Sequence, residues 1–218
     1  MGHYVLATGY DETDRQFIVQ DSYYGPDQVI GYDELESYWR AFNFTYLVVY
    51  PSEHGQKVTA ILGPHADVNY NNRHAEQVAL DEIEQLTGRD LFFAWFNLGS
   101  SRVQLRDYAG AALSFDKAFA VYPNIPNNER PWRMMWYQTG PYWAYYYTGR
   151  YQDVIDLAST TLGAMSEPVL EESYYWRALS REALGDGEEA VRDLRTALKY
   201  HPGFEPAIAR LQQLEVAP

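Results

Sequence analysis

The sequence predicts an α+β segment followed by an all-α solenoid of helical repeats. Over residues 1–51, short runs of β-branched and aromatic residues alternate with turn residues, which is typical of strands joined by hairpins. From about residue 71 the apolar residues recur with the period of a helix, and small residues recur where paired helices would cross. The 218 residues, 46% of them apolar and 16% aromatic, are enough to bury a core.

The charge and hydropathy of the chain exclude several kinds of partner. The formal net charge of −13 disfavours nucleic acid and an electrostatic anchor on an anionic membrane. No apolar run approaches the roughly 20 residues of a spanning helix, so we expect no membrane insertion. Without a visible leader the cytoplasm is the default compartment, and an extracytoplasmic location fits equally if the N-terminus is truncated.

No cofactor or metal site is expected. The sequence has no cysteine, so it offers no disulfide, no zinc–thiolate site and no thiol nucleophile. No glycine-rich loop for phosphate is present. His65, Asp67 and His74 stand at irregular spacing, which does not predict a metal site.

Residues 1–51 are predicted to form a partial domain. Its elements are strands over 3–10, 16–21, 29–32 and 46–50, and a helix over 33–42. The first two strands form a hairpin around the loop Asp11–Thr13, and the pattern Asp33-x-x-Glu36 predicts a capping box at the start of the helix. Pro51 ends the last strand, YLVVY.

Residues 52–70 are predicted to be an irregular connector, because glycine and proline interrupt them. The helical domain then covers residues 71–216. Its first predicted helix runs from about residue 71 to Gly88.

The helical domain contains a repeat of about 34 residues. In its first unit bulky residues, small residues and a closing proline stand at the spacing of paired helices: Trp95, Leu98, Gly99, Tyr108, Ala111, Phe115, Ala118 and Pro123. A degenerate second unit covers 136–162, with its extra length in a loop over Asn124–Pro131. A third unit covers 174–202, and a closing helix covers 204–215. The pattern resembles the tetratricopeptide repeat, which implies a solenoid that binds a protein or peptide.

The resemblance places first-helix side chains in the concave groove of the solenoid. They are Phe93 and Phe96 in the first unit, Trp136, Trp143, Tyr146 and Tyr147 in the second, and Tyr175 in the third. An aromatic groove suits an apolar or extended peptide. Two other interpretations stay open, in which the rings pack within the core or dock the N-terminal part. Arg130 and Arg133 flank them as hydrogen-bond donors, cation–π partners or solvated side chains.

Residues 3–51 resemble the His/Asp half of cysteine peptidase family 39, a papain-like family that trims double-glycine leaders. The stretches GHYVLATGYD, FIVQDSYYG, GYDELESYW and YLVVYP carry the resemblance. By position it implies His3 as the catalytic histidine and Asp21 as its orienting residue, while Ser22 replaces the family's proline. The family's nucleophilic Cys and oxyanion-hole Gln lie upstream, so this chain alone is not expected to be an active peptidase.

Two explanations for the absent half stay open: the chain is a fragment of a larger peptidase-like protein, or it is a natural remnant that kept only the sheet. Either way one face of the sheet needs cover from a missing N-terminal half, a second copy or the helical domain. If the hairpin loop has three residues, partner numbers sum to 24 and His3 lies opposite Asp21, within hydrogen-bonding reach. An even loop puts the two on opposite faces.

Overall fold

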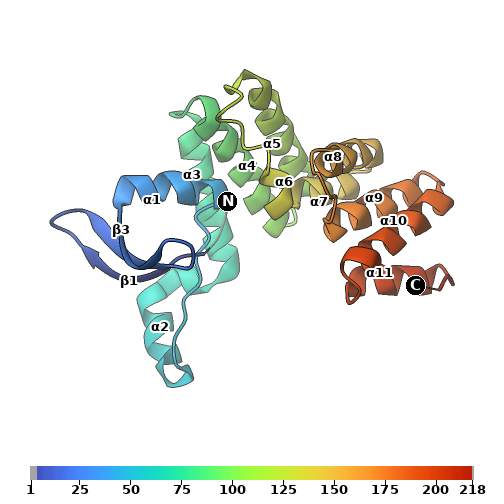
Figure 1. Cartoon of the computed structure of the whole chain (residues 1–218). Helices are drawn as coiled ribbons and strands as arrows, with labels where there is room; N and C mark the ends of the chain where they lie inside the picture. The colour runs from blue at the N-terminus through green and yellow to red at the C-terminus, as the bar shows by residue number, and fades with distance from the viewer. Residues whose placement is uncertain (1–3, 218) are drawn as a thin grey trace.

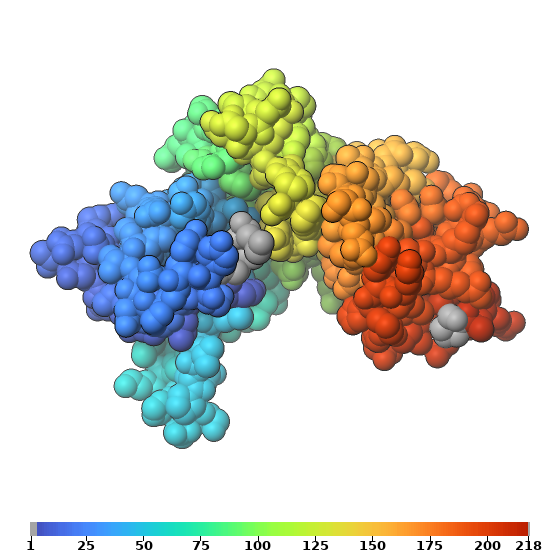
Figure 2. All heavy atoms as spheres, viewed as in Figure 1, coloured from blue at the N-terminus to red at the C-terminus, as the bar shows by residue number. Residues whose placement is uncertain are grey.

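The computed structural model describes residues 4–217. Figure 1 shows a small sheet with a helix beside it at the N-terminal end, followed by helices that curve round to the C-terminus. In Figure 2 the surface is hollowed between the N-terminal and C-terminal parts, which gives the molecule the outline of an arch. None of the helices within residues 4–217 combines the length and the apolar character of a bilayer span.

Three antiparallel strands form the sheet in the order β1-β2-β3. They are β1 (Leu6–Asp11), β2 (Gln16–Asp21) and β3 (Gly25–Gly31). The predicted hairpin is confirmed, but β3 begins four residues earlier than predicted. The reason is Gln20, whose side chain accepts a hydrogen bond from the backbone of Asp27 at 3.1 Å and donates one to its carboxylate at 2.9 Å.

The register of the β1–β2 hairpin differs from the predicted one. Leu6 pairs with Gln20 and Asp11 with Gln16, so the loop has four residues, 12–15, and partner numbers add up to 26 or 27 rather than 24. The Asp11 carboxylate accepts hydrogen bonds from two backbone N–H groups of the loop, at 2.8 and 3.2 Å, which closes this longer turn. A bulge in the middle of β1 then shifts the register by one residue.

The predicted helix after the sheet is confirmed. It consists of α1 (Tyr32–Trp39) and the 3-10 turn η1 (Arg40–Phe42). The predicted capping box is wrong, because no side chain caps the helix. Asp33 instead forms an ion pair with Arg15 at 3.1 Å, and Glu36 forms one with Arg40 at 2.9 Å.

The predicted strand over Tyr46–Tyr50 does not form. Residues 45–50 adopt neither helix nor strand, and the sheet of the described residues contains β1, β2 and β3 only. A strand forms only where a neighbouring strand provides hydrogen-bond partners for its backbone N–H and C=O groups. YLVVY has a high β-propensity, but propensity alone does not provide these partners.

The segment predicted to be an irregular connector is largely helical. It contains η2 (Ser52–His54), α2 (Gly55–Leu62), η3 (Gly63–Ala66) and the start of α3 (Val68–Ile83). Its helix breakers lie at helix boundaries: Gly55 opens α2, Gly63 ends it with a φ of 55°, and Pro64 lies in the first turn of η3. Asp67 caps α3 by accepting a hydrogen bond from the backbone N–H of Tyr70 at 2.7 Å.

The predicted pairs of helices are present. They are α4 (Gly88–Gln104) with α5 (Tyr108–Val121), α7 (Gly140–Tyr147) with α8 (Tyr151–Gly163), and α9 (Glu171–Ala183) with α10 (Gly187–Tyr200). A longer segment separates the first two pairs. It consists of the turn η4 (Tyr122–Asn124), the predicted loop and the short helix α6 (Met134–Tyr137). The closing helix is α11 (Glu205–Gln213).

Two clusters of buried side chains form the core of the helical part. The larger one joins α4 to α9, and its largest fully buried members are Phe92, Phe96, Phe115 and Tyr142. The smaller one joins α9, α10 and α11 around Leu194 and Leu211. The two clusters meet at α9, where Tyr175 packs against both.

The turn η1 fixes the N-terminal part to the repeats. The side chain of Arg40 is 11% exposed and pairs with Glu82 of α3 at 2.9 Å. The amide of Asn97 on α4 donates a hydrogen bond to the backbone oxygen of Arg40 at 2.8 Å, and Gln138 donates one to Ala41 at 2.6 Å. Three segments of the helical part therefore hold this turn.

The sheet itself is little covered by the helical part. Val19 is 4% exposed, but Leu6, Tyr10 and Val29 on the same three strands are 56%, 67% and 59% exposed. Within residues 4–217 the helical part therefore does not supply the cover that the sheet was expected to need.

Candidate functional site

Aromatic rings from three helices meet on one surface beside α7. We call this set the aromatic surface; its members are Tyr108, Trp143, Tyr146, Tyr147, Tyr175 and Trp176. Tyr147 stacks on Tyr108 with ring centroids 4.5 Å apart, and Trp143 lies 4.8 Å from Trp176. These separations are typical of interacting rings, so the members form one connected group.

The outer rings of the aromatic surface are accessible. The exposed fractions are 52% for Tyr147 and 38% for Trp143, whereas Trp176 is only 5% exposed and lies beneath them. Exposed rings on a packed base present large apolar area whose conformation is already fixed. Such groups are enriched at the centres of protein interfaces.

The sequence of α7, GPYWAYYY, explains why it presents these rings. Tyr142 and Tyr145 face the core with exposed fractions of 0% and 4%, so Trp143 and Tyr147, four residues apart, share the opposite face. Pro141 lies in the first turn, where its missing N–H costs no hydrogen bond. The inward hydroxyl of Tyr142 is 3.1 Å from the Ser173 hydroxyl.

A charged group on α5 holds the other end of α7. The Asp116 carboxylate accepts hydrogen bonds from the Tyr145 hydroxyl at 2.9 Å and from Arg150 at 2.7 and 3.0 Å. Burial raises the pKa of Tyr145, and the charge of Asp116 raises it further, so this hydroxyl stays a donor. The guanidinium of Arg150 also lies over the Tyr145 ring, 4.2 Å from its centroid.

Two tyrosines of the aromatic surface are held neutral by their surroundings. Burial raises the pKa values of both Tyr146 and Tyr175 above the ordinary value for tyrosine. Tyrosine hydroxyls are protonated at neutral pH in any case, and the raised pKa values extend that state to higher pH. A ligand on this surface meets uncharged, amphipathic rings.

Trp136 lines a cavity next to the aromatic surface. The cavity has a volume of ≈ 220 Å³ and lies between the segment 135–139 and the start of α9, residues 170–173. Trp136 Nε1 is buried and has no hydrogen-bond partner within the described residues. The carboxylates of Glu171 and Glu172 belong to the same lining. The lining of the cavity thus combines an indole ring with two acidic residues, and the unsatisfied Nε1 itself is not accessible to solvent.

The two arginines that flank the rings are not simply solvated. The guanidinium of Arg133 lies 4.4 Å from the Trp132 ring centroid and 5.1 Å from that of Trp136. Arg130 donates hydrogen bonds to the backbone oxygens of Ile125 at 2.8 Å and Pro123 at 2.6 Å. The predicted donor and cation–π roles are confirmed.

Phe93 and Phe96 do not line a groove. Their exposed fractions are 5% and 0%, and both belong to the larger core cluster together with Met134 and Met135 of α6. The prediction for these two residues is wrong. The segment between the first two helix pairs contributes α6 to this cluster, and repeat spacing alone does not reveal that packing.

The predicted pair His3 and Asp21 stays a prediction, because His3 lies outside the described residues. The Asp21 carboxylate accepts hydrogen bonds from the backbone N–H groups of Tyr23 and Tyr24, at 2.6 and 3.0 Å. It thereby closes the turn between β2 and β3.

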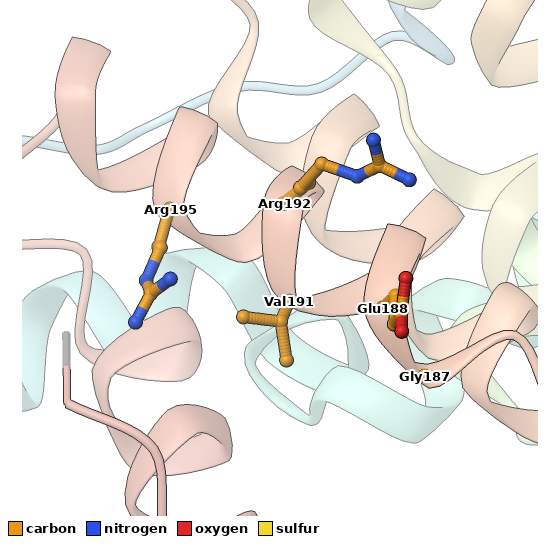
Figure 3. A pocket seen from close by; sticks show the side chains of 5 residues that line it. All are labelled: Gly187, Glu188, Val191, Arg192 and Arg195. Atoms are coloured by element: carbon orange, nitrogen blue, oxygen red, sulfur yellow. The ribbon is translucent and has the colours of Figure 1, made fainter.

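Two other places lack the features of a site. Figure 3 shows a hollow whose lining comes from α10 alone, with Val191 between the charged side chains of Glu188 and Arg195. Within residues 4–217 no three acidic or histidine side chains come together as a metal site would require. His65 is instead 3.0 Å from the Asn71 side-chain oxygen.

Sequence reasoning missed Tyr108, Trp132 and Trp176 as parts of the site. Tyr108 was assigned to the repeat pattern, but it stacks on an exposed ring. Trp132 stands directly before Arg133, and the pattern Trp-Arg-x-x-Trp was the available signal for a cation between two indoles.

Comparison with known families identifies part of the helical region. A tetratricopeptide-repeat model matches residues 172–203, which cover α9 except its first residue, the turn after it, α10 and the three residues that follow. The predicted repeat is confirmed there, and such repeats mediate interactions between proteins. No peptidase family matches the N-terminal part. A search of curated proteins finds no match to the chain.

Proposed function

We propose that this protein is an interaction module that binds an extended peptide segment of a partner protein across the aromatic surface. The observation that carries the proposal is the connected set of rings from α5, α7 and α9, of which Trp143 and Tyr147 are exposed. Exposed aromatic residues on a rigid base bind at a low cost in conformational entropy.

The cavity beside Trp136 supports the same function. The cavity lined by Trp136, Glu171 and Glu172 can take one side chain of a peptide that crosses the aromatic surface. Glu171 and Glu172 favour a basic side chain at that position. The protein has a net charge of −13, which attracts a positively charged partner. Together with the aromatic surface, this charge favours an apolar peptide that also carries basic residues.

The proposal is tested by selection from a phage-displayed library of random peptides of about twelve residues. Peptides enriched on the full chain are synthesised, and their Kd is measured by fluorescence anisotropy. The double variant Trp143→Ala/Tyr147→Ala should weaken binding at least about tenfold, because it removes the exposed rings. The far-UV circular dichroism of this variant should stay helical, since both rings lie outside the buried core.

The matched control is Tyr38→Ala. It removes a tyrosine that is 63% exposed on α1, away from the aromatic surface, and should leave the Kd unchanged. Enriched peptides that bind the double variant as tightly as the wild-type protein would show that the function lies elsewhere on the chain.

A second proposal concerns residues 1–51, which we infer to be the His/Asp half of a family 39-like peptidase domain. Its support is the resemblance together with the antiparallel hairpin and the helix that follows it. By the resemblance His3 and Asp21 would be the base and its orienting residue, and a cysteine from other sequence would be the nucleophile. The four-residue hairpin loop does not give the direct cross-strand pair expected of a three-residue loop, so this assignment rests on the resemblance. The gene sequence before codon 1 tests this: a Gln-x5-Cys-like stretch in frame supports it, and an in-frame stop codon there refutes it.

A further inference from the structure

The segment Tyr46–Tyr50 has the properties of a strand without having a neighbour. Its exposed fractions alternate along the chain: 42%, 71%, 44%, 87% and 44%. Such a period of two is typical of an extended chain with one side against the protein. Tyr46, Val48 and Tyr50 form the half-buried side, and Leu47 and Val49 point to solvent.

The half-buried side is held by the N-terminal part. The Tyr46 ring centroid lies 6.5 Å from that of Trp39 on α1, and Tyr50 borders Gly55 at the start of α2. The indole of Trp39 donates a hydrogen bond to the backbone oxygen of Thr45 at 2.6 Å, which fixes the beginning of the segment. Between η1 and η2, residues 45–50 adopt neither helix nor strand, and Figure 1 shows the chain running on from there to α2.

The backbone groups of this segment are unused. Within residues 4–217 no N–H or C=O group of residues 46–50 takes part in a hydrogen bond. An apolar segment with unpaired backbone groups is a template for another strand, which gains hydrogen bonds and buries Leu47 and Val49.

The net charge of the N-terminal part, to which the segment belongs, decides which kind of strand fits. Residues 4–51 contain eight Asp and Glu against two Arg, a net charge of −6. Both arginines are already used: Arg15 pairs with Asp33 at 3.1 Å, and Arg40 is buried against Glu36 and Glu82. A second copy of this chain would bring a further −6 to the contact, whereas a basic strand would be attracted.

We infer that Tyr46–Tyr50 is a docking site for an extended, basic strand of a partner protein, which pairs with it through the backbone. This inference is independent of the aromatic surface, because it rests on a different segment and different contacts. The partner strand alternates positive and apolar side chains.

The test uses a labelled peptide of about ten residues that alternates Lys and Val, and a counterpart with Glu in place of Lys. The Lys peptide should bind the full chain, with a Kd that rises with salt, and the Glu peptide should not bind. Hydrogen exchange should slow at the amides of residues 47–50 in the complex. Leu47→Pro, which removes one of these N–H groups, should weaken binding about tenfold.

The matched control is Ile61→Thr, which changes an apolar side chain that is 74% exposed on α2. It should leave the Kd unchanged, whereas Leu47→Thr/Val49→Thr should raise it. Three outcomes overturn the inference: equal binding of the Lys and Glu peptides, protection of amides outside residues 46–50 only, and a dimer in light scattering that Leu47→Pro dissociates. The last result would make a second copy the occupant.

Discussion

Gly99 on α4 is the position where one added methyl group tests the packing of the first helix pair. A Cβ atom there would lie 2.6, 2.8 and 2.8 Å from three atoms of the Phe115 ring. These distances are shorter than any ordinary carbon contact, so the ring or the helix has to move. Phe115 is fully buried, and on its other side the ring lies 3.1 Å from where a Cβ on Gly140 would be.

The expected effect of Gly99→Ala is the balance of two terms. Overpacking in a buried site costs about 1–3 kcal/mol, and the confined ring places this site at the upper end. Alanine stabilises a helix interior by about 1 kcal/mol relative to glycine. We therefore expect the free energy of unfolding to fall by about 2 kcal/mol, although the same exchange is favourable in an unhindered helix.

Urea denaturation followed by circular dichroism measures this difference. Gly187→Ala is the matched control, since Gly187 is helical and no heavy atom lies within 4 Å of its added Cβ. That control should be neutral or stabilising by up to about 1 kcal/mol. Phe115→Leu should couple to Gly99→Ala, so that the double variant loses less than the two single losses together. Equal stability of Gly99→Ala and the wild-type protein would refute the packing argument.

Three further predictions concern the core and its ion pairs. Phe96→Ala should cost about 3–5 kcal/mol in urea denaturation, whereas Trp143→Ala should cost less than about 1 kcal/mol; equal losses would contradict the separation of core and surface. Asp193→Ala should cost about 3–5 kcal/mol by the same assay. It removes the buried carboxylate that accepts hydrogen bonds from Arg177 and Arg181 at 2.7–2.8 Å, and both guanidinium groups lose their partner. Burial raises the pKa of Asp116, but hydrogen bonds from its partners lower it by more, below the ordinary 3.8. The stabilisation by its carboxylate is thus present above the ordinary pKa of about 4 and lost as the pH falls through the lowered pKa of the folded state. The stability difference between wild type and Asp116→Asn should therefore shrink as the pH falls below about 4, and a constant difference would contradict this.

The helices of the repeat region could be predicted because their signals are local. Gly99, Ala111 and Phe115 mark where two helices cross, and the pairs α4–α5, α7–α8 and α9–α10 follow that spacing. The start of α3 was predicted about three residues too late, although Asp67, a residue type that favours the N-cap, stands just before it.

The parts that were mispredicted depend on contacts between distant residues. YLVVY has strand propensity, but a strand requires a second chain segment, and none in residues 4–217 pairs with it. Phe93 and Phe96 have the spacing of groove residues, but Met134 and Met135 share their buried cluster. The hairpin register depended on one side chain, that of Asp11, which closes a four-residue loop.

The contacts of η1 connect the two proposed binding surfaces mechanically. Gln138, whose amide donates a hydrogen bond to the backbone oxygen of Ala41, stands two residues before the helix that carries Trp143 and Tyr147. On the other side, Phe42 is followed within four residues by the start of the segment 46–50. Because Arg40 is buried and paired with Glu82, η1 cannot shift without breaking an ion pair of low exposure. Each surface is therefore held at a fixed place relative to this turn, so a partner with a peptide for the aromatic surface and a basic strand for residues 46–50 could gain affinity from both contacts.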